Sequence, residues 1–317
     1  MKRCLYCYQE LDKENAGELH ARCSKEFFGT VVIPELSLEE EDIEKYATEI
    51  VKKHGTIPGV QPKLSLSIQK DPKDPKKSRL TLVGLWGDYI LKPQTKDFPS
   101  LPENEDLSMK LAALAGIKTA SHSLIRTTSG KLAYITKRFD RLKDKKVPVE
   151  DLCQLGELPS SGNSKYNSSM ERAGKTILQY SSAPLFDAII FFEITVFGFL
   201  TSNADMHLKN FSILRDNENQ YRIAPAYDLV CTPLAKPEDK EQMALTLNGK
   251  RNNIRNKDFY ELADRLTIKH LTVQRTIERQ LAKKKEWEAL IAISFLSEEM
   301  KERYIALIAS RMKKVVY

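Results

Sequence analysis

The sequence of 317 residues lacks an uninterrupted apolar run long enough to cross a membrane as a helix. Its most apolar stretch is residues 183–200, which Asp187 and Glu193 interrupt. A charged side chain near the centre of a bilayer costs roughly 2.5–3.5 kcal/mol on insertion scales. The basic first residues are not followed by the apolar segment of a secretory signal. We therefore expect a cytoplasmic protein without membrane contact, in which residues 183–200 form a buried core helix.

Aromatic residues are not interleaved with the lysines of the basic segments. The net charge is +7, and much of the basic excess lies in residues 70–77, 283–285 and 311–314. Such an excess forms either an ordinary solvated surface or a surface for an acidic partner, such as nucleic acid or a tRNA-bound protein. Without stacking aromatics, direct recognition of bases is not indicated.

Internal repeats and low-complexity tracts are also absent. Hydrophobic residues make up 41% of the chain and charged residues 29%, which is ordinary for a soluble globular protein. The length is sufficient for a sizeable core and for two lobes.

Cysteine is scarce, yet three of the five cysteines lie with a histidine near the N-terminus. The pattern is Cys4-x-x-Cys7, twelve further residues, and then His20-x-x-Cys23. The first pair fits a knuckle turn and the second fits one turn of a helix, and thiolate with imidazole suits tetrahedral Zn²⁺. One alternative is a set of small buried residues in an N-terminal cap without metal. A disulfide is disfavoured, because nothing places the chain in an oxidising compartment.

Residues 202–212, which read SNADMHLKNFS, have the layout of a kinase catalytic loop. In such a loop Asp205 orients the attacking hydroxyl, while Asn210 and a second Asp hold Mg²⁺. Asp228 stands 18 residues beyond Asn210, as that second Asp should. Between them, residues 211–214 and 221–223 are expected to form short strands around a turn.

Each of these polar residues also has a plainer interpretation. Asp205, Asn210 and Asp228 are residue types that commonly occupy turns and caps. His207 either supports the loop or contacts a phosphate. Lys209 either reaches the transferred phosphate or is an ordinary surface lysine.

The first half of the chain predicts a small β-rich lobe. A helix is expected over residues 38–53, followed by two glycines four apart, the second being Gly59, where backbone N–H groups could approach phosphates. Strands are expected over residues 64–68, 80–83 and 89–92. The last of them ends at Lys92, a candidate for binding the α- and β-phosphates of ATP.

A helix is expected over residues 103–116, with acidic residues in its first turn. Glu105 is the candidate to orient Lys92, and Glu103 and Asp106 compete with it for that role. A hairpin formed by residues 123–126 and 131–137 should lead into the hinge between the lobes.

Six short motifs together carry a resemblance to a known family. They occupy residues 59–63, 137–141, 150–154, 158–161, 203–212 and 224–228, in the order that the family has them. The chain thereby resembles the HipA-like serine/threonine kinases, the toxins of bacterial toxin–antitoxin pairs, over residues 50 to 310. The resemblance implies an α+β, two-lobed, protein-kinase-like fold. We divide it into a Cys/His knuckle (residues 1–30), an N-lobe (31–140) and a helical C-lobe (141–317).

The same resemblance implies ATP and Mg²⁺ as cofactors and assigns roles to individual residues. Asp205 is the catalytic base, assisted by Lys209, and Asn210 and Asp228 are the Mg²⁺ ligands. The phosphates and adenine would be bound by residues of the glycine loop, the strand end, the hinge and the catalytic loop: Gly59, Val60, Gln61, Lys63, Lys92, Arg138, Phe139 and His207. In the hinge, backbone groups would bind the adenine, with Phe139 and Tyr134 as walls of the site or as plain core residues.

Two features depart from the family. Thr56 stands where HipA-like kinases have a serine whose autophosphorylation is implied to eject the glycine loop, and Ser65 and Ser67 are nearby alternatives. About 50 residues precede the glycine loop, too few for the usual N-terminal subdomain. The resemblance therefore implies a separate small protein that supplies this subdomain, and a helix-turn-helix antitoxin through which DNA is contacted only indirectly.

The substrate implied by the family is a protein such as an aminoacyl-tRNA synthetase. Two other functions compete with this one. A non-catalytic regulator would bind ATP and a DNA-binding antitoxin, but the complete set of Asp205, Asn210 and Asp228 argues against it. A phosphotransferase for cationic small molecules would favour an acidic pocket, and the sequence shows none.

Overall fold

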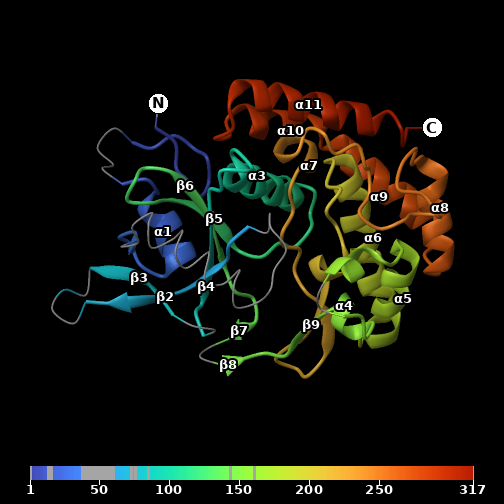
Figure 1. Cartoon of the computed structure of the whole chain (residues 1–317), viewed down its shortest axis with the longest axis horizontal. Coiled ribbons are helices and arrows are strands. Elements are labelled where there is room, and N and C mark those ends of the chain that lie inside the picture. The colour runs from blue at the N-terminus through green and yellow to red at the C-terminus, as the bar shows by residue number, and fades with distance from the viewer. Residues whose placement is uncertain are drawn as a thin grey trace. The chain divides into compact units, whose positions relative to one another are not determined.

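The computed structural model describes residues 2–12, 17–36, 61–71, 74, 77–83, 86–142, 145–159 and 162–316. The chain forms two compact units (Figure 1). The N-terminal unit comprises Met1–Asp106 and Ala120–Arg138, and the C-terminal unit comprises Leu107–Thr119 and Phe139–Tyr317. The expected helix over residues 38–53, together with Thr56, Gly59 and Val60, lies outside the described residues.

The N-terminal unit is built on a six-stranded sheet of order β1-β3-β2-β4-β6-β5. The β1–β3 pair is parallel and the other pairs are antiparallel. Its elements are α1 (Ala21–Phe28), β1 (Glu35–Leu36), β2 (Leu64–Lys70), β3 (Ser78–Leu82), β4 (Tyr89–Pro93), β5 (His122–Arg126), β6 (Leu132–Lys137) and the first turns of α3 (Leu101–Leu114). The strands predicted from residues 64–68, 80–83, 89–92, 123–126 and 131–137 are therefore confirmed.

Alternation of apolar and polar residues explains why β2 lies in this sheet. Leu64 and Leu66 are buried, while Ser65 and Ser67 between and beside them are half-buried, as expected for side chains that alternate between the two faces of a strand. The N-terminal segment packs against the neighbouring strand, because the ring of Phe27 lies 5.7 Å from that of Tyr89. The knuckle region thus shares the hydrophobic core of the sheet.

The C-terminal unit is mainly helical. Its helices are α4 (Leu152–Leu155), α5 (Met170–Tyr180), α6 (Pro184–Leu200), α7 (Thr232–Ala235), α8 (Asn256–Arg265), α9 (His270–Ala282), α10 (Lys284–Ala292) and α11 (Glu298–Met312), with the 3-10 helices η1 (Gly162–Tyr166) and η2 (Leu208–Asn210). Its strands are β9 (Val149–Asp151), β10 (Ser212–Arg215) and β11 (Tyr221–Ile223), which form a sheet of order β11-β10-β9, and the pair β7 (Arg141–Leu142) and β8 (Lys145–Lys146). The hairpin predicted around residues 216–219 is the β10–β11 pair.

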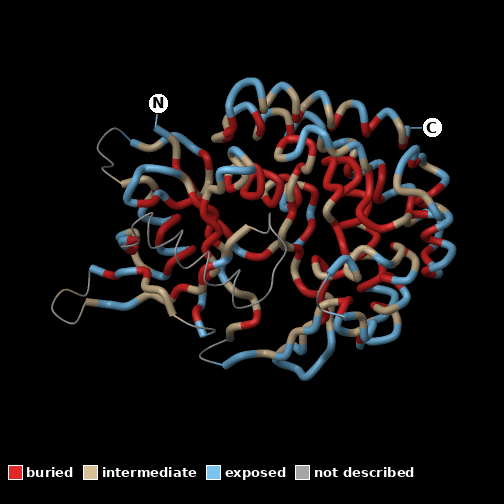
Figure 2. The backbone as a smooth tube through the Cα atoms, viewed as in Figure 1, coloured by how far each residue is buried: buried red, intermediate tan, exposed pale blue. Residues whose placement is uncertain are grey.

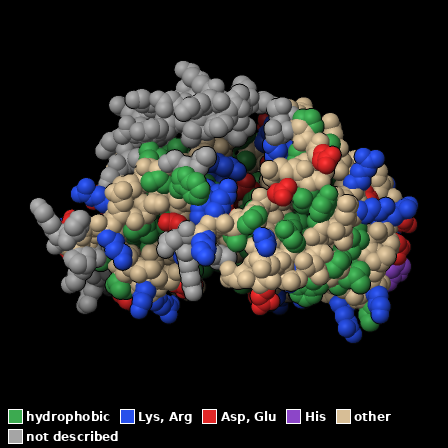
Figure 3. Space-filling model, turned by 90° about the horizontal axis from the view of Figure 1, so that it is seen from below, with side chains coloured by type: hydrophobic (Ala, Val, Ile, Leu, Met, Phe, Trp, Pro, Cys, Tyr) green, Lys and Arg blue, Asp and Glu red, His purple; other side chains and the backbone are tan. Residues whose placement is uncertain are grey.

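Helix α6 is the centre of the C-terminal unit, and most of its residues are buried (Figure 2). Phe191, Phe192, Phe197 and Phe199 are fully buried, so the prediction of a buried core helix is confirmed. In the described part of the chain, no helix is long and apolar enough to cross a membrane. Lys and Arg side chains are spread across the described part of the face drawn in Figure 3, which fits a solvated surface.

Candidate active site

The predicted catalytic loop follows the C-terminal end of α6 and leads into β10. Four hydrogen bonds fix its backbone. The Asn203 N–H donates to the carbonyl of Gly198 at 2.7 Å, and the Asn203 side chain accepts from the Asp205 N–H at 3.1 Å. The Thr232 hydroxyl donates to the Ser202 carbonyl at 3.0 Å and accepts from the N–H of Ala204 at 2.9 Å. Because α6 is buried, the loop rests on a rigid support.

Asp205 combines a fixed backbone with an accessible carboxylate. Its side chain is 43% exposed, whereas Asn203 and His207 on either side are buried. The hydroxyl of Tyr166 donates to its Oδ1 at 2.9 Å. A carboxylate that is held in place yet open to solvent can accept a proton from an incoming hydroxyl group.

His207 lies beneath this carboxylate. Its Nε2 is 3.9 Å from the nearer oxygen of Asp205, and the ring packs edge-on against Tyr166 with centroids 5.2 Å apart. Burial lowers the pKa of His207 to about 4, although the charge of Asp205 acts in the opposite direction. The imidazole is therefore neutral near pH 7. A neutral, buried ring fits support of the loop better than a charged contact with phosphate.

This histidine predicts a specific dependence of stability on pH. The folded-state pKa of about 4 lies below the ordinary value of about 6.5. The contribution of His207 to the free energy of unfolding is therefore present above pH 6.5 and is lost as the pH falls toward 4. Between pH 7 and pH 5 the loss should be about 2 kcal/mol. Urea unfolding of metal-free, nucleotide-free protein at pH 7 and pH 5 measures this loss of unfolding free energy. In His207→Gln the loss should be smaller than in wild type by about 2 kcal/mol. The exposed His270→Gln variant should behave as wild type, and equal losses in all three proteins would contradict the prediction.

Asn210 and Asp228 differ in how they are held. The Asn210 Nδ2 donates to the carbonyl of Asp205 at 2.9 Å, which leaves its amide oxygen as the atom able to bind a cation. Asp228 follows β11 and has φ +55°, a left-handed conformation that non-glycine residues seldom adopt. Such backbone conformations cluster at functional sites, where the surroundings hold them.

Tyr227 connects the two segments that carry these residues, and only its place before Asp228 could have indicated it from the sequence. Its hydroxyl donates to the carbonyl of Lys209 at 2.8 Å and lies 2.6 Å from the hydroxyl of Ser212. Its ring lies 5.5 Å from that of Phe139. The segment that ends at Asp228 is thereby tied to the catalytic loop.

The N-terminal unit contains a buried ion pair. Lys92 Nζ lies 2.5 Å from Oε1 of Glu105, and both side chains are almost fully buried. The ammonium group also lies 5.3 Å from the ring centroid of Tyr134, which is a core residue. Of the three acidic candidates for the partner of Lys92, the structure thus selects Glu105. A buried ion pair is costly to desolvate, so its presence favours a positional role.

Other predicted nucleotide-binding residues lie close by within the same unit. The Gln61 side chain donates to the carbonyl of Pro93 at 3.2 Å. Lys63 is exposed just before β2. The Arg138 N–H donates to the carbonyl of Asp88 at 2.8 Å.

The four predicted zinc ligands are brought together within the N-terminal unit. One ligand atom from each of Cys4, Cys7, His20 and Cys23 lies within 4.8 Å of every other. Bonds of about 2.3 Å to sulfur and 2.0 Å to nitrogen around a tetrahedral ion place its ligand atoms roughly 3.5–3.8 Å apart. His20 Nδ1 lies 3.4 Å from the sulfur of Cys7 and 3.7 Å from that of Cys23. The residues therefore fit zinc.

The electrostatics of the cluster also favour a cation. For Cys4, burial raises the pKa, but backbone N–H groups of Cys7, His20 and Tyr6 outweigh it, so that the pKa is lowered overall. Burial, with the charge of Cys4, raises the pKa of Cys23 to about 12. A divalent cation would offset the repulsion that keeps these thiols from ionising together.

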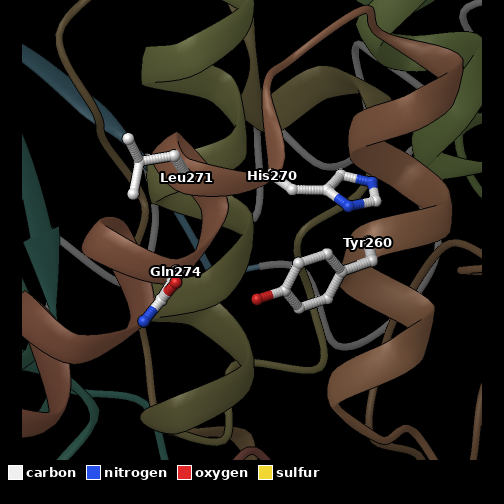
Figure 4. Close-up of a pocket in the computed structure, with 4 residues that line it drawn as sticks. All are labelled: Tyr260, His270, Leu271 and Gln274. Atoms are coloured by element: carbon white, nitrogen blue, oxygen red, sulfur yellow. The ribbon is translucent and has the colours of Figure 1, made fainter.

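A surface pocket between α8 and α9 does not belong to this site. Tyr260, His270, Leu271 and Gln274 line it (Figure 4), and the last three of them are exposed. Its ring contact, 4.9 Å between the centroids of Tyr260 and His270, packs two helices together. We assign no chemistry to it.

An Asp–Asn–Asp set on a loop and hairpin, and a buried ion pair between a strand lysine and a helix glutamate, are the parts from which protein kinases are built. Comparison with known proteins agrees. The model of the HipA-like C-terminal domain matches residues 55–287. The chain belongs to this family.

Relatives and solved structures are consistent with this membership. A Haemophilus influenzae protein named "Putative kinase" is 26% identical over 271 residues, which cover 77% of this chain and 76% of that protein. Two Sinorhizobium fredii proteins, named "Putative kinase Y4mE" and "Putative kinase Y4dM", are 34% and 30% identical, over 54% and 74% of this chain, but the matches span only 42% and 59% of their own lengths.

Two solved structures share the fold. HipA of Shewanella oneidensis, solved with HipB and operator DNA, aligns with a TM-score of 0.65 at 20% identity, over 84% of this chain and 70% of its own. The Helicobacter pylori proinflammatory kinase CtkA aligns with a TM-score of 0.52 at 19% identity, over 78% and 92%. The prediction of an α+β, protein-kinase-like fold is confirmed.

Proposed function

We propose that this protein is an ATP-dependent serine/threonine protein kinase. The observation that carries the proposal is the Asp205 carboxylate, which is 43% exposed on a loop whose other residues are mostly buried. Asn210 is tied to the backbone of that same aspartate. A loop built to present one carboxylate and one amide oxygen suits phosphoryl transfer, where catalysis is mainly positioning and electrostatic stabilisation.

Each residue of the proposed site has a distinct task. Asp205 orients the substrate hydroxyl and accepts its proton, and Lys209 stabilises the transferred phosphoryl group. Asn210 and Asp228 would hold Mg²⁺, which neutralises charge on the phosphates when bound. Lys92, oriented by Glu105, would bind the α- and β-phosphates. The backbone of Arg138 and the ring of Phe139 would contact the adenine.

We propose further that the kinase is the toxin of a toxin–antitoxin system and acts on a protein of translation, such as an aminoacyl-tRNA synthetase. The family and the HipA–HipB complex with operator DNA support a helix-turn-helix antitoxin as partner. A small protein that supplies the N-terminal subdomain would be a second partner. DNA contact would be made by the antitoxin alone.

Incubation with γ-labelled ATP and a lysate of the host tests this function. Wild-type protein should label a small number of lysate proteins on serine or threonine, and Asp205→Asn should label none. Nucleotide binding without any labelled protein would instead support a non-catalytic regulator that binds ATP and the antitoxin. Labelling of small molecules alone would support a phosphotransferase of the other class.

The glycine loop supplies a separate prediction. Some phosphate should accumulate on Thr56 during expression of the wild type and inhibit the enzyme, because about two negative charges would enter a loop that binds ATP phosphates. Peptide mass spectrometry of wild type beside Asp205→Asn measures it, with Ser65 and Ser67 monitored in the same digest. Phosphate at Thr56 in both proteins would point to another kinase, and phosphate in neither would remove autophosphorylation as the switch.

A further inference from the structure

The Cys/His cluster is connected to the helix that carries Glu105. Tyr8 follows the first cysteine pair, its side chain is fully buried, and its hydroxyl donates to Oδ2 of Asp106 at 2.7 Å. Asp106 is the next residue after Glu105 on α3 and is itself fully buried. All of these residues belong to the N-terminal unit.

We propose that Cys4, Cys7, His20 and Cys23 bind one Zn²⁺, and that this ion holds Tyr8 against Asp106 and so positions the turn of α3 that presents Glu105 to Lys92. The zinc site is then a structural clamp on the Lys92–Glu105 pair. It takes no direct part in chemistry. The inference rests on the N-terminal unit alone and does not depend on the kinase assignment.

The orientation of His20 points to a metal ligand. Its Nε2 lies 3.0 Å from the carbonyl of Glu10, and since a carbonyl only accepts, Nε2 carries the proton. The lone pair is then on Nδ1, which faces the sulfurs of Cys7 and Cys23 at 3.4 and 3.7 Å. A histidine whose second nitrogen donates to a backbone carbonyl is the usual arrangement at a metal site. Three thiolates and one imidazole complete the tetrahedral set that zinc prefers.

Backbone contacts show how the cluster fixes Tyr8. The Tyr8 N–H donates to the carbonyl of Cys4 at 2.9 Å, and the Cys4 N–H donates to the carbonyl of Gln9 at 2.9 Å. The neighbouring Leu5 N–H donates to the carbonyl of Glu18 at 2.9 Å. Tyr8 has φ +63°, which is unfavourable for a bulky side chain and persists only where the surroundings enforce it. Zinc at Cys4 and Cys7 would supply that enforcement.

At the other end, one buried network leads from Tyr8 to the ion pair. Oδ1 of Asp106 pairs with Nδ1 of His122 at 2.7 Å. The His122 ring stacks on Tyr134 with centroids 5.7 Å apart, and Lys92 lies over the same tyrosine. Asp106 adjoins Glu105 along α3, and Tyr134 lies under the ammonium group of Lys92, so loss of the Tyr8 contact should be felt at the Lys92–Glu105 pair.

Metal analysis of the full chain, purified without chelator or added metal, tests the first half of the proposal. We expect one equivalent of zinc in wild type, less than half of that in Cys7→Ser, and one equivalent in the control Cys153→Ser, whose buried thiol lies outside the cluster. Zinc near zero in wild type, or a stoichiometric amount of another metal in its place, would overturn the assignment.

Hydrogen–deuterium exchange of α3 tests the second half. Tyr8→Phe should keep its zinc but lose the hydrogen bond to the Asp106 carboxylate. Loss of a hydrogen bond to a charged group raises the equilibrium constant for local opening by about tenfold. Amides in the first turns of α3 should therefore exchange about tenfold faster in Tyr8→Phe and in zinc-depleted wild type, whereas α11 should exchange as before. Unchanged exchange in both proteins would show that the zinc site does not position α3. Neither readout requires kinase activity, so failure here is distinct from failure of the proposed function.

Discussion

Replacing Asp205 by Asn should lower the rate of phosphoryl transfer by at least about 100-fold, since a positioned general base contributes roughly 10²–10⁴-fold. The substitution keeps the size of the side chain and its contact with Tyr166, but the amide cannot accept the hydroxyl proton. Binding of Mg·ATP should change little, because Asp205 is not among the proposed ligands of the metal or the nucleotide. Initial rates with the labelled protein substrate, and nucleotide titration in the same buffer, measure the two effects.

A surface variant supplies the matched control for this experiment. Asp264→Asn changes an aspartate of the same unit whose side chain is 57% exposed and pairs with His270, and it should leave transfer within about twofold, because exposed ion pairs are worth little. If Asp205→Asn retains the wild-type rate while its thermal unfolding is normal, another residue is the base and the assignment of the loop is wrong. Loss of nucleotide binding together with transfer would instead place Asp205 among the groups that hold the metal.

The sequence predicted which candidate residues lie near one another wherever the information was local. The proximity of Asp205 and Asn210 in one short loop is specified by their spacing along the chain, and alternating burial in β2 is specified by a period of two. The set of candidate metal ligands was likewise recognisable, because two short pairs, Cys4 with Cys7 and His20 with Cys23, must each form one turn.

The sequence alone did not predict contacts between segments that are distant along the chain. The hydroxyl of Tyr166 meets Asp205 from 39 residues away, and nothing in either segment specifies the other. The choice among the acidic residues of α3 was also undetermined, because successive helical residues point about 100° apart and the facing strand decides which of them meets Lys92. Packing turned Glu105 to Lys92 and Asp106 to Tyr8 and His122.

The contacts of Asp187 were also not predictable from the sequence. Its replacement has the largest expected effect on stability. The sequence identified it only as a charge that interrupts an apolar stretch, whereas the structure shows it fully buried as an acceptor for three groups. The Ser181 hydroxyl donates to it at 2.6 Å, the Ile223 N–H at 2.9 Å and the Arg222 guanidinium at 2.9 Å. Ile223 and Arg222 lie on β11, so one buried carboxylate anchors the hairpin that leads to Asp228.

Asp187→Ala should therefore lower the free energy of unfolding by about 3 kcal/mol. Breaking a buried ion pair costs roughly 3–5 kcal/mol, and the lower end applies because the Arg222 side chain is 32% exposed and can reach water when its partner is lost. Urea unfolding at pH 7 measures the change. Binding of Mg²⁺ with nucleotide should weaken as well, because the hairpin that ends at Asp228 loses its anchor.

The control lies on the same helix. Glu193 pairs with Arg279, and their side chains are 18% and 43% exposed, so both partners reach solvent and the ion pair contributes only about 1 kcal/mol or less. Glu193→Ala should thus cost much less than Asp187→Ala and leave nucleotide binding unchanged, although both remove one carboxylate from α6. Equal costs for the two variants would mean that the buried anchor of the hairpin contributes no more than a surface pair, and the link from α6 through β11 to Asp228 would have to be abandoned.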